Sequence, residues 1–191
     1  MPEPSSTQHS SPAACELVHS SRPLRVQLRK DLTRSIKRGH AWLYSDAVEI
    51  RAAASGSTAI VYGRKEQAVA SGIYDPQHPI PLRICRTHPP WDLDDRWITQ
   101  QLERAADLRR ATLPAETSGF RLIAGEGDAL PGLIIDIYDR TAVIKLDGGG
   151  PESFYRPEGI AAWLVGQLGM QTVVLRQRQR GTPGRVIAGG E

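Results

Sequence analysis

"GEGDALPG", from Gly125 to Gly132, joins two apolar runs and is the stretch that decides the fold of this chain. A dinucleotide-binding loop needs the pattern G-x-G-x-x-G between a strand and a helix, so that the phosphates meet the helix N-terminus. Here Leu130 stands where the third glycine is required, and "LIIDIY" (133–138), which follows, is typical of a strand. The Gly-Lys-Ser/Thr of a P-loop is also missing. The stretch therefore predicts a shaped connection between two strands.

Three acidic residues, Glu126, Asp128 and Asp136, lie in or just after this stretch. Two of them could form a carboxylate pair for acid–base catalysis, but no partner nucleophile is evident in the sequence. Acidic side chains beside turns more often accept hydrogen bonds from nearby backbone amides. We favour the structural role and keep a small carboxylate-dependent hydrolase as a less favoured alternative.

The sequence on both sides of the stretch predicts a small α+β domain. Asp92 is a good helix N-cap, and Pro157 suits the first turn of a second helix that ends at Gly169. Alternating and apolar runs predict strands at 120–124, 133–138, 142–146 and 172–175. The order of elements favours an α+β class, and we place the boundary with the first half near Pro89 and Pro90.

The first half predicts a compact β-barrel-like module. Short strands are expected at 24–28, 58–62, 68–74 and 81–85, separated by turn-forming residues. Between the first two of these strands, Leu32 and Ile36 are four residues apart, which indicates a short helix with one apolar face. Gly39 is a plausible end for that helix.

The net charge of +3 is unevenly distributed along the 191 residues. The segment 25–40 contains six basic residues and one acidic residue, so it carries 6 − 1 = +5 and the remainder carries 3 − 5 = −2. A basic patch on a near-neutral protein predicts a surface that faces a polyanion. Candidate RNA-binding residues are Arg29, Lys30, Arg34, Lys37, Arg38 and His40.

The competing interpretation of this patch is a solvated helix face. Trp42, two residues after His40, could stack on an unpaired base, but packing in the core or at the rim of the barrel is the favoured prediction for such a large aromatic residue. For His40 the two interpretations are about equally supported. The Arg–Gln run at 176–180 either adds to an RNA surface or belongs to a strand, and the sequence leaves this open.

No apolar run reaches the roughly 18 residues of a membrane span, and residues 1–23 lack the pattern of a secretory signal. Their Ser- and Pro-rich composition predicts a disordered tail. Two cysteines, Cys15 and Cys85, are too few for a disulfide framework, which suits the cytoplasm. Cys85 and His88 could supply half of a metal site, but a second pair is missing, so we expect a buried thiol and no metal.

Two segments together resemble one known family. "RLIAGEGDALPGLIIDIYDRTAVIKL" (121–146) resembles the signature of the bacterial large-subunit (23S) ribosomal RNA cytosine-5 methyltransferases. "RKDLTRSIKRGHAWLYSDAV" (29–48) resembles the opening segment of that family, which belongs to a PUA domain, an RNA-binding pseudo-barrel. The two matches occur in the order found in the family.

This resemblance implies a PUA domain, then a connecting α+β domain, then a Rossmann-like domain that binds S-adenosylmethionine and carries a catalytic cysteine. Neither Cys15 nor Cys85 lies in a matching context, so no catalytic or cofactor residue can be assigned. The expected fold class is a PUA-like β pseudo-barrel followed by a small α+β domain, with the Rossmann-like methyltransferase domain absent. The expected division is a tail at 1–23, a PUA-like domain at 24–90, an α+β domain at 91–180 and a truncated linker at 181–191.

The sequence thus predicts the RNA-binding part of a ribosomal RNA methyltransferase. Its expected partners are structured ribosomal RNA and a methyltransferase domain in cis or in trans, without a membrane. The chain itself is expected to bind no S-adenosylmethionine and to be inactive alone. The alternatives are a standalone RNA-binding module and a protein-interaction module that binds an acidic protein.

Overall fold

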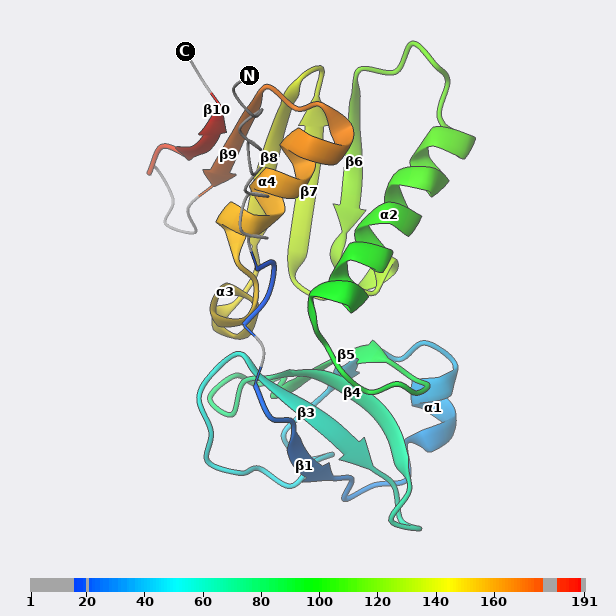
Figure 1. Ribbon diagram of the computed structural model, residues 1–191. Coiled ribbons are helices and arrows are strands. Elements are labelled where there is room, and N and C mark those ends of the chain that lie inside the picture. Colours follow the sequence, from blue (N-terminus) through cyan, green and yellow to red (C-terminus); the bar gives the residue numbers. More distant parts are fainter. Residues whose placement is uncertain (1–15, 20, 177–181, 190–191) are drawn as a thin grey trace, which may run out of the picture.

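The computed structural model describes residues 16–19, 21–176 and 182–189. Two five-stranded sheets lie one above the other in Figure 1, and each has its own buried apolar cluster. The chain passes from the first sheet to the second between residues 86 and 95, where the sequence placed Pro89 and Pro90 at a boundary. We propose that the chain divides into two domains there. Within the described residues, no helix is long and apolar enough to cross a membrane.

The first sheet has the strand order β1-β3-β4-β5-β2, and α1 lies beside it (Figure 1). Strand β1 runs parallel to β3, whereas the other neighbouring strands are antiparallel. Its elements are β1 (Leu24–Gln27), α1 (Thr33–Lys37), β2 (Trp42–Leu43), β3 (Ser57–Tyr62), β4 (Ala68–Tyr74) and β5 (Leu82–Arg86). The strands predicted for this half are confirmed, while β2 was not predicted.

The core of the first sheet explains why α1 forms where it does. Val26, Ile36, Leu43 and Val61 are fully buried, and Ile36 is the side chain by which α1 packs on the sheet. Leu32 is only partly buried and stands at the N-cap position. The helix therefore has a single buried apolar residue, and its remaining side chains are available to solvent.

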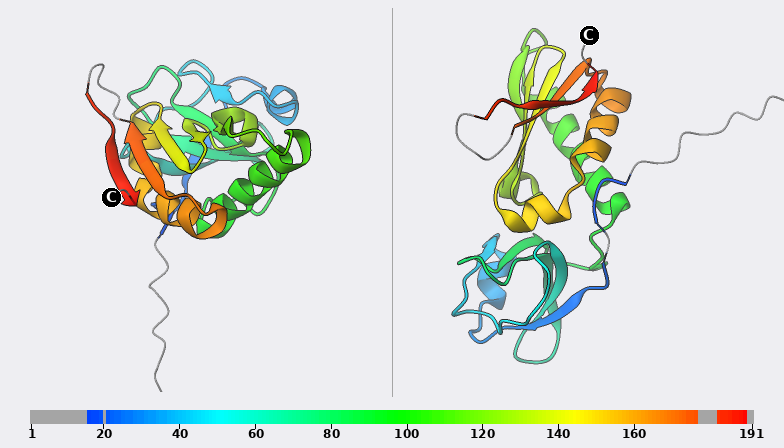
Figure 2. Two further views of the ribbon diagram at one scale, coloured as in Figure 1. Left: turned by 90° about the horizontal axis from the view of Figure 1, so that it is seen from above. Right: turned by 90° about the vertical axis from the view of Figure 1, so that its left-hand side faces the viewer.

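The second sheet has the order β10-β9-β8-β7-β6, in which only β8 and β9 are parallel. Helices α2 and α4 cover one of its faces (Figures 1 and 2). The strands are β6 (Gly119–Ala124), β7 (Leu133–Tyr138), β8 (Thr141–Leu146), β9 (Thr172–Arg176) and β10 (Arg185–Gly189). The helices are α2 (Asp95–Thr112), α3 (Gly149–Phe154) and α4 (Pro157–Leu168), and a 3-10 turn, η1 (Gly125–Asp128), joins β6 to β7.

Alternating side chains build the second core. Leu133, Ile135 and Ile137 of β7 point into it, and Ile98 and Leu102 of α2 pack against them within one buried cluster. This period-two pattern is the one that the sequence showed for 133–138. The predicted strands and the helix beginning at Pro157 are confirmed; α3 and β10 were not predicted.

Helix α2 begins two residues later than predicted. Asp94, rather than Asp92, is the N-cap, and its Oδ1 accepts a hydrogen bond of 2.8 Å from the backbone N–H of Trp97. Leu93 is buried, so the chain turns into the helix after it enters the core. Asp92 and Asp94 suit the N-cap position equally well by residue type, and the burial of Leu93 places the cap at Asp94.

Replacing Asp94 with alanine is expected to lower the free energy of unfolding by about 1 kcal/mol, because the N–H of Trp97 loses its acceptor. Asp92→Ala, at an exposed side chain outside the helix, should change it by less than about 0.5 kcal/mol. Urea unfolding of both variants measures the difference. Equal effects of the two substitutions would contradict the assignment of the cap.

Residues 16–19 do not belong to a disordered tail, contrary to the sequence prediction. Asp95 Oδ1 accepts hydrogen bonds from the backbone N–H groups of Leu17 and Val18 at 2.9 and 3.1 Å. Both side chains are buried in the second core, and Val18 forms a β-bridge with Tyr155. The prediction failed because the partners of Leu17 and Val18, which include Asp95 and Tyr155, lie far along the chain. Residues 1–15, with Cys15, lie outside the described part.

The expected truncated linker at 181–191 also needs correction. Arg185–Gly189 form β10, which pairs antiparallel with β9 and packs Ile187 and Ala188 against the second core. The short apolar run "VIA" is the sequence signal for this strand, and its pairing partner is β9. Arg176, the first residue of the Arg–Gln run, is the last residue of β9. The other residues of the run, 177–180, lie outside the described part.

Candidate nucleic-acid interface

The predicted RNA-binding residues lie together on the surface around α1. All of them are exposed, and the cationic side chains among them are hereafter called the basic surface: Arg29, Lys30, Arg34, Lys37 and Arg38, with His40 beside them. Arg34, Lys37 and Arg38 line one groove together with Asp31 and Thr33. The helix is shorter than predicted, with five residues, yet the cluster it carries is the one found in the sequence.

Most of the basic surface is available to a ligand. Lys30 is the exception, because its Nζ lies 2.5 Å from Asp46 Oδ2. Its hydrogen bond lowers the pKa of the Asp46 carboxyl. Among the described residues, Arg29, Arg34, Lys37 and Arg38 have no acidic partner within ion-pair distance. Four cations on one small area, without an acidic partner in the described part of the chain, suit a polyanion such as a phosphate backbone.

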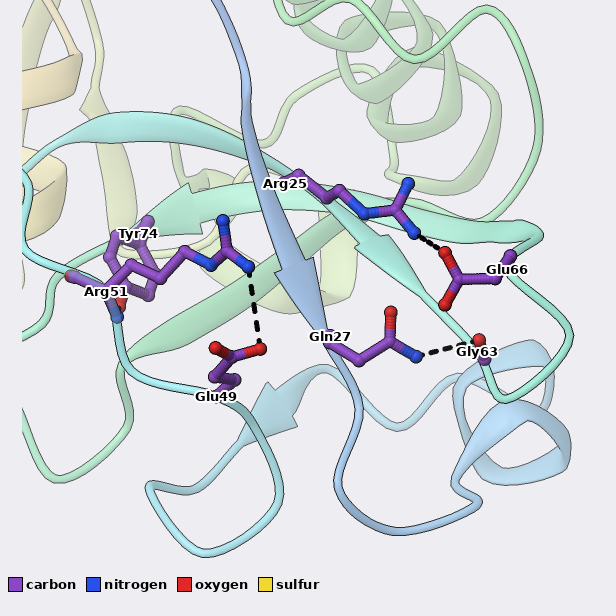
Figure 3. A network of polar contacts seen from close by, with 7 residues as sticks. All are labelled: Arg25, Gln27, Glu49, Arg51, Gly63, Glu66 and Tyr74. Atoms are coloured by element: carbon purple, nitrogen blue, oxygen red, sulfur yellow. Dashed lines mark hydrogen bonds and ion pairs between the residues drawn. The ribbon is translucent and has the colours of Figure 1, made fainter.

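Two other cations of the first half, Arg25 and Arg51, are already compensated by acids (Figure 3). Arg25 forms an ion pair with Glu66, and its guanidinium lies 3.8 Å from the centre of the Tyr62 ring. Arg51 lies 3.6 Å from Glu49. Arg25 contributed to the +5 counted in the sequence, but its charge is neutralised locally. Arg25 and Arg51 are therefore not counted in the basic surface.

Two aromatic side chains are exposed beside the basic surface. Trp42 in β2 is 40% exposed and Tyr44 is 46% exposed, while Leu43 between them is buried. Trp42 is not a core residue; of the two packing positions that the sequence allowed, its place on an edge strand fits the rim. Strand β2 is the edge of its sheet, so alternation turns Leu43 inward and leaves its two neighbours outside.

The glycine-rich stretch forms a strand–turn–strand connection, as predicted. Residues 125–128 are a 3-10 turn between antiparallel strands, and Ala129 and Gly132 have positive φ angles of 58° and 74°. Asp128 stabilises the turn: its Oδ2 accepts from the backbone N–H of Ala124 at 2.6 Å, and the carboxylate makes a two-bond ion pair with Arg109 at 2.6 and 2.7 Å. This acid has the structural role that the sequence favoured.

Glu126 joins the two sheets. Its Oε1 accepts a hydrogen bond from Trp42 Nε1 at 2.8 Å and one from Arg83 Nη1 at 3.1 Å. Both partners belong to the first sheet, whereas Glu126 belongs to the turn of the second. Arg83 is a buried cation in β5, and sequence reasoning missed it. The arginine in "PLRIC", a strand with apolar neighbours, was the available signal, because a buried charge needs a partner.

The carboxylates near the turn are not arranged as an acid–base pair. Glu126 is held by Arg83, Asp128 by Arg109 and Asp136 by Arg121, the last at 2.8 Å. The guanidinium partners occupy both oxygens of Asp128 and of Asp136 and one oxygen of Glu126. The geometry gives no support to the hydrolase alternative.

Cys85 is a buried thiol in β5, as predicted, and burial raises its pKa far above the usual range. His88 is exposed, with Nδ1 3.3 Å from the carbonyl oxygen of Pro89. In the described ranges, no group of three or more His, Cys, Asp or Glu residues could hold a metal ion.

Comparison with known proteins supports the assignment of the first half. Residues 26–87 match the family described as a PUA-like domain. The chain is 38% identical over 135 residues to a "Ribosomal RNA large subunit methyltransferase" of Deinococcus radiodurans, covering 66% of this chain and 33% of the relative. A "Ribosomal RNA large subunit methyltransferase I" of Escherichia coli is 32% identical over 132 residues, covering 68% and 33%. The chain thus spans about a third of the curated relatives that it matches.

Solved structures share the fold. A Streptococcus mutans protein described as a SAM-dependent methyltransferase superimposes with a TM-score of 0.70 at 15% identity, covering 88% of this chain and 44% of its own. A second methyltransferase structure, a complex with SAH, gives a TM-score of 0.69 at 16% identity, covering 88% and 43%. These likenesses establish the fold.

The predicted fold class is corrected by these findings. Both sheets are mixed and associated with helices, and 88% of the chain superimposes on methyltransferases. The described chain therefore shares its fold with the matched 43–44% of those chains, and the expectation of an absent Rossmann-like domain was wrong. The PUA-like domain and the homology to large-subunit ribosomal RNA methyltransferases are confirmed.

The residues of the glycine-rich stretch do not fit S-adenosylmethionine, the methyl donor that the fold implies. Nucleotide sites of parallel α/β sheets use a turn that leads from a strand into a helix and a carboxylate that is available to ribose hydroxyls. Here the turn leads into antiparallel β7, both oxygens of Asp128 are bonded to Arg109, and Glu126 is bonded to Arg83 through Oε1.

Proposed function

We propose that this chain acts in the methylation of large-subunit ribosomal RNA and that its own contribution is to bind the structured RNA through the basic surface. The observation that carries the proposal is the set of four exposed cations around α1 that have no ion-pair partner among the described residues. They belong to the PUA-like half, in which Arg25 and Arg51 are paired with acids. The homologues named as ribosomal RNA methyltransferases supply the class of RNA.

The mechanism of this binding is electrostatic. Each cation that neutralises a phosphate releases condensed counterions, so the affinity rises as salt is lowered. Contacts of this kind set the position of the RNA and carry little sequence information. The basic surface would hold the RNA backbone while an acceptor base is presented for methylation.

We propose cytosine C5 as the acceptor and the cytoplasm as the site of action. The support for cytosine is the resemblance of residues 121–146 to the cytosine-5 methyltransferase signature. Methyl transfer itself is assigned to a methyltransferase domain that acts in cis or in trans with the RNA-binding part.

The proposal is tested by fluorescence anisotropy of a labelled large-subunit ribosomal RNA fragment at several salt concentrations. The variant Arg34→Ala/Lys37→Ala/Arg38→Ala should bind more weakly, and the slope of log Kd against log salt should flatten by about 2, since each lost phosphate contact contributes roughly 0.7–0.9. The control Arg110→Ala/Arg140→Ala/Arg185→Ala removes the same charge from the second sheet and its helices. It should leave the slope close to that of the wild type.

An unchanged slope in the α1 variant would contradict the proposal. Binding that unlabelled RNA cannot displace, but that an acidic protein can, would instead favour the protein-interaction module.

A further inference from the structure

A groove of about 280 Å³ lies between α2 and the η1 turn. Its walls include Gln101, Arg104 and Leu108 of α2 and Glu126 and Gly127 of the turn. Leu108 is 52% exposed, so the groove has an apolar wall as well as polar groups. Its volume is just below the roughly 300–1,000 Å³ of pockets that hold drug-sized ligands, which suits a ligand no larger than one nucleotide.

Trp42 connects this groove with the first sheet. Its indole N–H donates to Glu126 Oε1 at 2.8 Å, and Glu126 is itself a wall of the groove. The hydrogen bond holds the indole against Glu126, and 40% of the side chain remains exposed. In Figure 1, helices α1 and α2 both lie on the right-hand side of the molecule, so the basic surface and the groove can face one ligand.

The charges of the groove favour a nucleotide. Glu126 and Asp128 are compensated by Arg83 and Arg109, at 3.1 and 2.6 Å. Arg104 is exposed and has no acidic partner within ion-pair distance among the described residues. Arg104 is therefore the cation of the groove that remains for a ligand, and its guanidinium can bind a phosphate through two parallel N–H donors.

We infer that this groove binds one unpaired nucleotide of the RNA, with its base against the Trp42 indole and its phosphate at Arg104. The inference rests on the proposed RNA-binding function. An unpaired nucleotide is required because side chains cannot read the deep, narrow major groove of an A-form duplex, whereas splayed bases stack on aromatic side chains.

Glu126 gives the site a preference among bases. Its Oε2 accepts no hydrogen bond from the described residues, so it can accept one from a ligand. The exocyclic amine of cytosine donates to carboxylates, whereas uracil presents a carbonyl oxygen at the same position. The groove should therefore prefer an unpaired cytosine to an unpaired uracil.

The test compares four labelled RNA hairpins that share one stem and differ at a single bulged position, which holds cytosine, uracil, an abasic nucleotide or no nucleotide. Wild-type protein should bind the cytosine hairpin at least about fivefold more tightly than the abasic one, since stacking on an aromatic side chain contributes about 1–3 kcal/mol per base. It should also prefer cytosine to uracil.

Three variants locate the effect. Trp42→Leu should abolish the difference between the cytosine and abasic hairpins. Arg104→Ala, on an exposed helix position, should reduce the advantage of a bulged hairpin over the fully paired one. Arg140→Ala, an exposed arginine in the turn between β7 and β8, should alter neither.

The outcomes separate this inference from the proposed function. Salt-dependent binding of all four hairpins with equal affinity would overturn the nucleotide site and leave the RNA-binding function standing. A cytosine preference that survives Trp42→Leu, in a protein with unchanged circular dichroism, would also overturn it. Failure to bind any hairpin at low salt would count against the proposed function itself.

Discussion

Replacing Asp128 with asparagine is expected to lower the free energy of unfolding by about 3 kcal/mol, at the lower end of the range for breaking a buried ion pair. The carboxylate is 7% exposed and the Arg109 side chain 16%, so the substitution leaves a largely buried guanidinium without its anion. It also weakens the acceptor for the N–H of Ala124. Urea unfolding measures the loss.

A double-mutant cycle identifies the cause. Arg109→Met should also destabilise the protein, and combining it with Asp128→Asn should restore part of the loss, because the interaction between the two charges is then already absent. Asp107→Asn is the matched control on the same helix. Its ion pair with Arg110 is exposed, with side chains 72% and 69% accessible, and it should change the stability by less than about 1 kcal/mol. Strict additivity at Asp128 and Arg109 would contradict the coupling.

The turn at 125–132 shows what the sequence could predict. Glycine, proline and aspartate shape the backbone locally, and the strand pattern of "LIIDIY" that follows is enough to exclude a phosphate-binding loop. The partner of Asp128 was beyond that reasoning. Arg109 lies 19 residues earlier on α2, and only the packing of that helix on the sheet brings the two together.

The candidate site, too, could be predicted only in part from the sequence. The basic surface could be found from charge counted along the segment 25–40, since α1 and its flanks keep those residues close together. The neutralisation of Arg25 by Glu66 and of Lys30 by Asp46 required the fold. The nucleotide groove could not be predicted at all, because Trp42 and Glu126 are 84 residues apart.

Gly72→Ala is expected to cost about 3 kcal/mol, at the upper end of the usual range for overpacking. A Cβ at this position in β4 would lie 2.2 Å from the carbonyl oxygen of Arg83 and 2.9 Å from its carbonyl carbon. Both atoms are backbone, so the clash cannot be relieved by a side-chain rotation and β5 must shift. Because the Arg83 guanidinium holds Glu126, the shift should also disturb the contact between the sheets.

The control for this prediction is Gly166→Ala. Gly166 is an exposed position in α4 where an added Cβ meets no atom within 4 Å. The same chemical change should there raise the stability by roughly 0.5 kcal/mol, because alanine favours the helix. Urea unfolding then compares one methyl group placed against backbone with one placed in solvent. If Gly72→Ala proved as harmless as Gly166→Ala, the close approach of β4 and β5, and with it the placement of Arg83 against Glu126, would be wrong.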